Sequence, residues 1–448
     1  MRGLPADWSA HRLDEIADIR LGRQRSPKNH VGPQMRPYLR AANIGWAGLK
    51  LDDIKSMNFS DSEMGVYQLS PGDVLLNEAS GSPGEVGKPA LWSGELDECA
   101  FQNTLIRIRS HDVEPRYLLH YFRYVALIGG FSGHARGVGI HHLSRARIAG
   151  WSTPIPPPDE QRRIVDILED HLSRLDAAER GIVFSVDRSA SLKERVLAAG
   201  LLGETTPGPR EPYDLPDCGT DDGQLPDLPM GWTWRRLGEI TNVAGGITKD
   251  SKRQSDPAFV EVPYLRVANV QRGRLDLAKV TSIRVPASKA KALRLLAGDV
   301  LMNEGGDRDK LARGWVWEGQ VEDCIHQNHV FRARIVDGAI EPKLLSWAAN
   351  TIGGRWAERN GKQSVNLASI SLTKIRQMPV PVPPMGVQPE LVKQLEDQLQ
   401  ACDRLAVSLN EARARAATLR RSLLAAAFSG RLTGQVTDTE MVEEMARV

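Results

Sequence analysis

Two short stretches that recur decide how this sequence is interpreted. Residues 37–44 read PYLRAANI, and residues 263–270 read PYLRVANV, 226 positions later. Residues 72–78 read GDVLLNE, and residues 298–304 read GDVLMNE, at the same offset. Three further pairs nearly keep this offset: Cys99 and Cys324, Glu114 and Glu341, and Gln161 and Gln388. The repetition predicts an internal duplication with small loop insertions, which has to be recognised before a fold is assigned.

Each half is predicted to contain a mixed domain followed by a long helix. Short alternating apolar runs, such as 73–76 and 104–109, predict strands. Proline runs at 154–158 and 379–384 are expected to stop strands and to stiffen the connection to the helix. The predicted order is a domain over residues 1–158, a long helix over 159–203, an acidic proline-rich linker over 204–228, a second domain over 229–384, a second long helix over 385–430 and a tail over 431–448.

The two predicted helices carry matching heptad stripes. In the second helix the stripe is Cys402, Leu405, Leu409, Ala412, Ala416, Leu419 and Leu423. The equivalent positions in the first are Leu175, Ala178, Ile182, Ser185, Ser189, Leu192 and Val196. About 40 residues at 1.5 Å each predict a rod of roughly 60 Å. The stripes favour an antiparallel coiled coil with pseudo-twofold symmetry, and the alternative is that each stripe packs on its own domain. The predicted fold class is α+β, with two duplicated mixed domains separated by the two long helices.

Composition limits the class of protein. Of the 448 residues, 41% are apolar and 25% are charged, as in globular proteins. No apolar run approaches the roughly 18 to 20 residues that span a bilayer, and the start has no signal-peptide core. Four cysteines stand singly, without the paired spacing of a zinc site or a disulfide framework. A soluble cytoplasmic protein without a membrane partner is expected.

The net charge of +2 hides a strong segregation of charge. Residues 19–51 and 115–158 contain bases but no acid, whereas acids crowd the linker and the tail. Basic surfaces of this kind can hold a phosphate backbone, although ordinary solvated faces are the alternative. The linker is predicted to be solvated.

The sequence contains no recognisable catalytic motif. Residues 81–89 read GSPGEVGKP, which resembles a phosphate loop, but the glycine spacing is wrong and Pro89 replaces the hydroxyl residue after Lys88. His141, His142, His326 and His329 lack acidic or cysteine partners at ligand spacing. We therefore expect no catalytic residue and no metal site.

The layout resembles the specificity (S) subunit of type I restriction-modification enzymes over nearly the whole chain. The resemblance depends on the two repeated motifs, the Gln-Asn pairs at 102–103 and 327–328, and the junction of proline run, Gln161 or Gln388, and long helix. It implies two target-recognition domains, each reading one half of a bipartite asymmetric site in double-stranded DNA. It also implies that the helices hold two methyltransferase (modification) subunits, which restriction subunits join. S-adenosylmethionine, ATP and magnesium would belong to those partners, and this chain would bind no cofactor.

Residues that are identical in both halves cannot distinguish two different half-sites, so we expect them to be scaffold groups or to contact the DNA backbone. Divergent loops are better candidates for base contacts, because Arg and Lys match guanine and Asn and Gln match adenine. The candidate DNA-binding residues are Arg23, Gln24, Arg25, Lys28, Arg40, Asn43, Lys88, Arg136, His141, Lys249, Lys252, Arg253, Arg266, Asn269, Arg308, Lys310, Arg313, Arg359 and Lys362. The candidate partner-docking residues are Leu175, Ile182, Leu192, Leu405, Leu409 and Leu419.

Two other functions stay open from the residues alone. A nuclease-like enzyme with an unfamiliar site would change DNA in the presence of magnesium. A coiled-coil adaptor without a DNA role would lack the steep salt dependence of a protein that contacts several phosphates.

Overall fold

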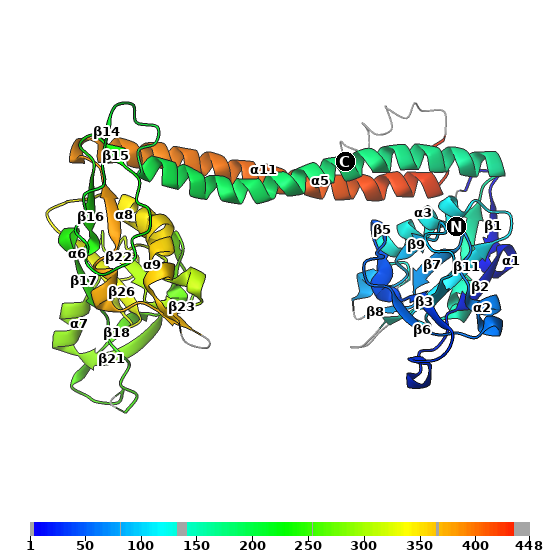
Figure 1. The fold of residues 1–448 in the computed structure, drawn as a ribbon, viewed down its shortest axis with the longest axis horizontal. Helices are drawn as coiled ribbons and strands as arrows, with labels where there is room; N and C mark the ends of the chain where they lie inside the picture. Colours follow the sequence, from blue (N-terminus) through cyan, green and yellow to red (C-terminus); the bar gives the residue numbers. More distant parts are fainter. Residues whose placement is uncertain (1–3, 81, 132–140, 253, 364–366, 434–448) are drawn as a thin grey trace. The chain divides into compact units, whose positions relative to one another are not determined.

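The computed structural model describes residues 4–80, 82–131, 141–252, 254–363 and 367–433. The chain divides into two compact units (Figure 1): unit 1 comprises residues 1–184 and 409–448, and unit 2 comprises residues 185–408. Two long helices, α5 (Pro158–Leu201) and α11 (Gln388–Phe428), each contribute to both units. No helix in the described ranges has the length and apolar character needed to cross a membrane.

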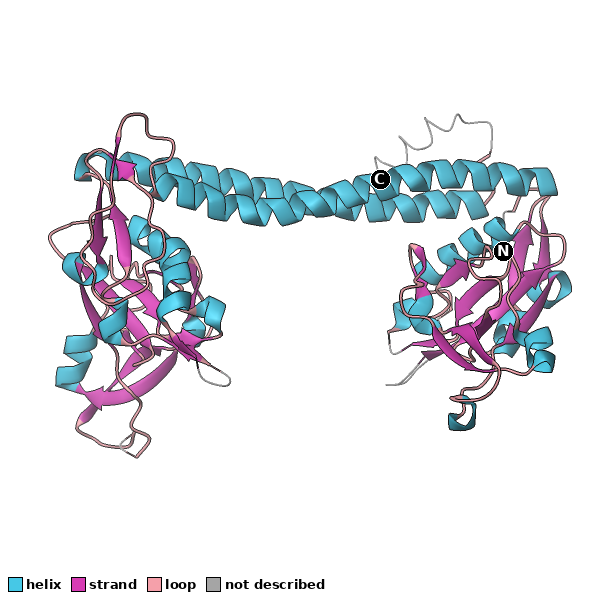
Figure 2. Cartoon of the chain, in the orientation of Figure 1, coloured by secondary structure: helices cyan, strands magenta, loops and turns pink. Residues whose placement is uncertain are grey.

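Unit 1 is built on a four-stranded antiparallel sheet with a helix on one face and a second sheet on the other (Figure 2). The strands are β2 (Ala17–Leu21), β11 (Leu105–Ser110), β7 (Val74–Asn77) and β9 (Pro89–Leu91), in that order. Val74 and Leu76 pack toward α3 (Pro115–Leu127), while Leu75 packs toward Leu39. Alternation along β7 therefore supplies two separate cores. The second sheet has the order β10 (Ala100–Phe101), β3 (Met35–Leu39), β6 (Lys55–Asn58).

Unit 2 repeats this topology strand for strand. Its four-stranded sheet has the order β17 (Thr241–Gly245), β26 (Val330–Ile335), β22 (Val300–Asn303), β24 (Gly314–Val316). Its second sheet contains β21 (Thr281–Pro286), β18 (Phe259–Leu265) and β25 (Ile325–His326). The counterpart of α3 is α8 (Pro342–Ala348), followed by a π-helical turn, η6 (Ala349–Gly353), and α9 (Gly354–Asn360). The predicted α+β duplication is confirmed.

The first residues of each proline run belong to a strand, which was not expected, but both strands end inside the run, as expected. Strand β13 (Ser152–Ile155) pairs antiparallel with β1 (Ser9–Arg12), and β29 (Pro379–Val382) pairs with β16 (Thr233–Arg236). Each pair is an isolated two-stranded ribbon, in which prolines can occupy positions that donate no ladder hydrogen bond. Each ribbon joins the start of its domain to the residues just before the long helix.

Helices α5 and α11 run antiparallel within each unit. In unit 1, Thr433 hydrogen-bonds to Glu160, and Arg420 pairs with Asp176 further along α5. In unit 2, Lys193 pairs with Asp403. The predicted coiled-coil pairing of the two helices is therefore present in both units.

Two residues that the heptad pattern placed between the helices are exposed instead. Leu192 is 39% exposed and Leu405 is 45% exposed, so neither lies in the seam. The partly buried Ala406 takes the interior position between Cys402 and Leu409, because the stripe drifts by one residue along a helix with 3.6 residues per turn. Leu175, Ile182, Leu409 and Leu419 are partly buried, as a seam requires.

Each domain core is completed by the end of a long helix. In unit 1 the ring of Phe428 lies 5.4 Å from that of Tyr117 and 5.3 Å from that of Tyr121, centroid to centroid, in edge-to-face geometry. Leu201, at the equivalent end of α5, is buried in the core of unit 2. Both helices then stop at glycines in the left-handed region, Gly203 (φ +58°) and Gly430 (φ +75°).

We predict that Phe428→Ala loosens unit 1 selectively. The buried aromatic ring is lost from the core, which typically costs about 3–5 kcal/mol of unfolding free energy. Amide hydrogen exchange should accelerate in α3 and β11, while β22 and β26 of unit 2 keep their protection. The matched control is Leu405→Ala on the same helix, where the side chain is largely exposed. Equal exchange in α3 of both variants would contradict the prediction.

Most residues of the acidic linker are exposed, as expected for a solvated segment, but the linker is also attached to unit 2. Its strand β14 (Arg210–Glu211) pairs with β15 (Leu228–Pro229), and Leu215 packs with Leu228, Trp232 and Trp234. Apolar residues between the acids therefore hold the linker on unit 2.

Asp222 is the main polar anchor of the linker. Its two carboxylate oxygens accept hydrogen bonds from Arg236 at 2.9 and 2.8 Å, and one of them also accepts from Trp356 Nε1 at 2.8 Å. Next to it, the backbone of Asp221 exchanges two hydrogen bonds with the amide of Asn360. Burial alone would raise the pKa of Asp222, but the bonds from Arg236 and Trp356 outweigh burial and lower it.

We predict that Asp222→Asn lowers the unfolding free energy of unit 2 by about 3 kcal/mol at neutral pH, because it leaves the buried Arg236 without its counter-charge. A lowered carboxyl pKa stabilises the fold above the ordinary pKa of aspartate, and this contribution is lost as the pH falls through the lowered value. Urea unfolding should therefore show the difference between variant and wild type at pH 7 and a smaller one near pH 3. Asp214→Asn, at an exposed position of the same linker, is the control. A pH-independent difference would contradict this account.

Candidate nucleic-acid interface

The asparagines that follow the repeated PYLR sequence stabilise a turn inside each domain and do not point to its surface. Asn43 is buried; its Oδ1 accepts from the backbone N of Arg40 at 3.1 Å, and its Nδ2 donates to the carbonyls of Lys50 at 2.8 Å and Asp53 at 3.2 Å. Asn269 makes the equivalent hydrogen bonds in unit 2. Both amides are used inside their domains, so neither is available to DNA in this conformation. We assign them a scaffold role.

The arginines of the same motif have different neighbours in the two domains. Arg40 Nη2 lies 2.5 Å from the carboxylate of Asp53. In unit 2 the position of Asp53 is occupied by Lys279, 226 residues later. Arg266 therefore lacks the carboxylate that neutralises Arg40. The turn carries Lys50 and Asp53 in unit 1 and Asp276 and Lys279 in unit 2, so its lysine and its carboxylate exchange positions between the domains.

The first divergent loop, residues 22–30, contains one internal arginine and several exposed polar side chains. Arg23 donates to the carbonyl of Asn58 at 2.7 Å, pairs with Glu63 at 2.6 Å and lies over the ring of Phe59. It is a structural group. Gln24, Arg25 and Lys28 are exposed, and Arg25 Nε donates to Nε2 of His30 at 3.1 Å.

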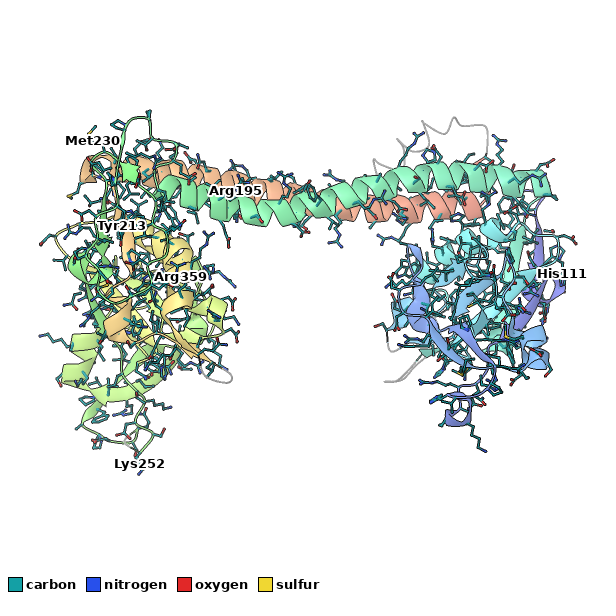
Figure 3. All side chains as sticks on the ribbon, viewed as in Figure 1. His111, Arg195, Tyr213, Met230, Lys252 and Arg359 are labelled. Carbon is teal, nitrogen blue, oxygen red and sulfur yellow. The ribbon has the colours of Figure 1, made fainter. Side chains whose placement is uncertain are left out.

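The corresponding loop of unit 2 carries Lys249 and Lys252, both exposed. Figure 3 shows Lys252 at the end of unit 2 opposite to Met230, which lies beside the start of α11. The third base predicted in this loop, Arg253, is outside the described residues. The exposed bases of this loop therefore gather at the end of the domain that is remote from its own helix.

Two other divergent loops of unit 2 are brought together by a small sheet. Strand β23 (Gly305–Gly306) pairs with β28 (Ala368–Ser369), which pairs with β27 (Lys362–Gln363). Lys362 and Arg308 are exposed there, and Arg308 donates to the carbonyl of Glu358 at 3.2 Å. In unit 1, β8 (Ala79–Ser80) pairs with β12 (His141–His142) in the same way. The side chain of His141 and the whole of Arg136 lie outside what the structure describes.

The remaining predicted bases of these loops are engaged within the protein. Lys88 is buried, pairs with Glu85 and lies near the ring of Trp46, so it is not a surface phosphate ligand. Lys310 pairs with Asp307. Arg313 is partly buried, and burial, together with the neighbouring charge of Arg272, lowers its pKa.

Arg359 is exposed but is hydrogen-bonded to the linker. Its Nη2 donates to the carbonyl of Asp222 at 2.8 Å, and its Nε lies 3.8 Å from the carboxylate of Asp221. Figure 3 labels Arg359 in the middle of unit 2, away from the Lys252 loop. Backbone and carboxylate groups of the linker thus engage this predicted DNA contact, although its side chain stays partly accessible.

Sequence reasoning missed an ion pair at one end of each four-stranded sheet, beside the start of β7 or β22. The buried Asp73 of the GDV motif pairs with Arg109, both nitrogen–oxygen distances being 2.7 Å, and Asp299 pairs with Arg334 in the same geometry. The two arginines are themselves repeat mates, 225 residues apart. Searching the duplication for charge-complementary pairs could have identified this bridge.

The glutamates that end the GDV motifs each face a histidine. Glu78 lies 3.2 Å from His142 Nδ1, and Glu304 lies 2.7 Å from His329 Nδ1. The two histidines are not repeat mates, so the pairing recurs from different parts of the chain. Across the described ranges, no group of three or more His, Cys, Asp or Glu side chains is arranged to hold a metal ion.

Comparison with known proteins shows what this chain is similar to. Residues 5–182 match the type I restriction modification DNA specificity domain. The chain is 24% identical over 441 residues to the type I restriction enzyme StySPI specificity subunit of Salmonella potsdam, covering 96% of this chain and 90% of that protein. It is 22% identical over 442 residues to the EcoKI specificity subunit of Escherichia coli K12, with the same coverage.

Solved structures share the fold. A chain from a structure of type I restriction-modification complex assembly superimposes with a TM-score of 0.70 at 20% identity, covering 96% of this chain and 100% of that chain. The HsdS subunit of Thermoanaerobacter tengcongensis gives a TM-score of 0.56 at 20% identity, covering 96% of this chain and 98% of that one. The resemblance seen in the repeated motifs is thus confirmed: this chain is similar over nearly its whole length to the specificity subunits of type I restriction-modification enzymes, and its residues 5–182 match the model of their DNA specificity domain.

Proposed function

We propose that this chain is the non-catalytic DNA-recognition subunit of a type I restriction-modification complex, and that each of its two domains reads one half of a bipartite asymmetric site. The observation that carries the proposal is the duplicated fold with divergent loops. The two domains share strand order and buried motif residues, whereas the exposed polar side chains of their equivalent loops differ. A shared scaffold with different exposed groups suits a protein that reads two different sequences.

We expect the loop residues that stay exposed to make the DNA contacts. In unit 1 these are Gln24, Arg25 and Lys28, and in unit 2 they are Lys249, Lys252, Arg308 and Lys362. A bidentate contact from one of these side chains to a base would contribute about 1–3 kcal/mol of discrimination. Arg266, which lacks the carboxylate neighbour of Arg40, is the better phosphate ligand of the two motif arginines.

The proposed partners are two methyltransferase subunits held by the helices, with restriction subunits bound through them. The relatives are named as subunits of restriction enzymes, which supports this assembly. Leu192 and Leu405 leave the seam and are exposed in this chain, as a docking surface for a partner requires. S-adenosylmethionine, ATP and magnesium would be bound by the partners.

The decisive experiment is modified-base sequencing of the host genome with and without this gene. Deletion should abolish methylation at one bipartite motif and leave every other methylated motif unchanged, because the subunit directs the methyltransferase to its site. Complementation with the gene should restore the motif. Unchanged methylation in a strain that transcribes the gene and its methyltransferase would refute the proposal.

We further predict that Lys249→Ala with Lys252→Ala weakens DNA binding by the full chain at low salt. Each phosphate contact that is lost reduces the slope of log K against log salt by about 0.9, so the double variant should lower it by about 2. Fluorescence anisotropy between about 50 and 200 mM salt measures the slope. Lys393→Ala with Arg404→Ala removes the same charge from exposed positions on α11 and should leave the slope unchanged. Equal slopes for the two double variants would exclude this loop from the interface.

A further inference from the structure

The junction between each domain and its long helix contains a buried glutamine. Gln161 lies in the first turn of α5, and Gln388 is the first residue of α11. The two are repeat mates, and both are almost completely buried, at 3% and 2% exposure. A buried amide is tolerated only when its polar atoms are hydrogen-bonded, so the contacts of these side chains are informative.

Both amides make the same bridge across the junction. Gln161 Oε1 accepts from the backbone N of Glu114 at 2.9 Å, and its Nε2 donates to the carbonyl of Pro156 at 2.9 Å. Gln388 Oε1 accepts from the backbone N of Glu341 at 2.6 Å, and its Nε2 donates to the carbonyl of Pro383 at 2.8 Å. In each unit one side chain thus joins the start of α3 or α8, the proline strand and the long helix.

A second attachment lies further along each long helix. Arg116 of α3 pairs with Glu169 of α5 at 3.0 Å, and Lys343 of α8 pairs with Glu396 of α11. The glutamate is eight residues beyond the glutamine in both helices, which corresponds to about 12 Å along the axis. Apolar residues near the start of each helix, such as Ile164 and Leu395, are also buried in the domain core. The glutamine bridge and the ion pair add two polar attachments, separated along the axis, to this packing, and together they fix the direction in which the helix leaves its domain.

We propose that Gln161 and Gln388 are positioning residues that set the tolerated spacing between the two half-sites. This inference rests on the proposed function. Adding one base pair to the spacer moves a half-site by about 3.4 Å and rotates it by about 35° about the DNA axis. A hinge at the junction between domain and helix would absorb part of this displacement. The glutamine bridge, supported by the ion pair, resists it and so makes the protein reject sites with the wrong spacer.

The test uses Gln388→Met, which keeps the side-chain volume and removes all three side-chain hydrogen bonds, including the one that Nε2 donates to the carbonyl of Ala339 at 3.2 Å. The variant gene replaces the wild-type gene in the host, and modified-base sequencing reports methylation at all pairs of half-sites in the genome. We expect methylation at spacers one base pair longer or shorter to rise at least tenfold over wild type, with the bases of each half-site unchanged. Gln398→Met, at an exposed position of the same helix, should retain the wild-type spacing.

The second variant is Glu396→Gln, which removes only the ion pair with Lys343. It should raise methylation at the longer and shorter spacers less than Gln388→Met does. Methylation confined to the wild-type spacer in both variants would overturn the inference, even if its level fell, because a purely structural role changes the level alone. Loss of all methylation in both variants would also overturn it. A wild-type strain without any bipartite motif contradicts the proposed function itself and is recognised before any variant is made.

Discussion

Each domain of this chain depends on a helix end contributed by the other half of the sequence. Phe428, more than 300 residues beyond the α3 tyrosines that it contacts, closes the core of unit 1. Leu201 closes the core of unit 2, whose strands begin after it in the chain. Burial of apolar surface is the main contribution to folding stability. Each domain therefore depends for part of its stability on the helix end that packs into its core. The antiparallel pairing, the buried junctions and the docked linker all follow from placing these two helix ends.

The duplication made most of the fold predictable from the sequence. Repeated motifs located equivalent strands, and the heptad stripes identified two helices that pair antiparallel. The errors were local. Leu192 and Leu405 left the seam because a strict heptad drifts on a straight helix. The proline strands were missed because prolines at an edge need no ladder hydrogen bond. The attachment of the linker to unit 2 was not predicted, because its charge was counted while Leu215 and Asp222, which hold it in place, were not.

The candidate interface was less predictable, because sequence identity between repeats does not distinguish buried groups from exposed ones. Asn43, Lys88 and Arg23 carry the side chains that nucleic-acid contacts use, yet the fold uses each of them internally. Arg359 is occupied by a segment more than 130 residues away in the chain. Burial and hydrogen-bond partners depend on tertiary contacts that no local pattern encodes. The divergent loops were predicted to contact bases because their sequences differ between the repeats. More of the residues predicted in these loops are exposed in the structure.

The contribution of Phe428 to unit 1 also affects how the protein is made. The residues of α3 leave the ribosome about 300 residues before the ring that completes their core. At about 5–20 residues per second, the first domain waits roughly 15 to 60 seconds with its tyrosines uncovered. Contacts at such sequence separation are also slow to form once synthesis ends. The domain that is translated first is therefore the last to be finished, and during this interval the nascent chain depends on protection from aggregation.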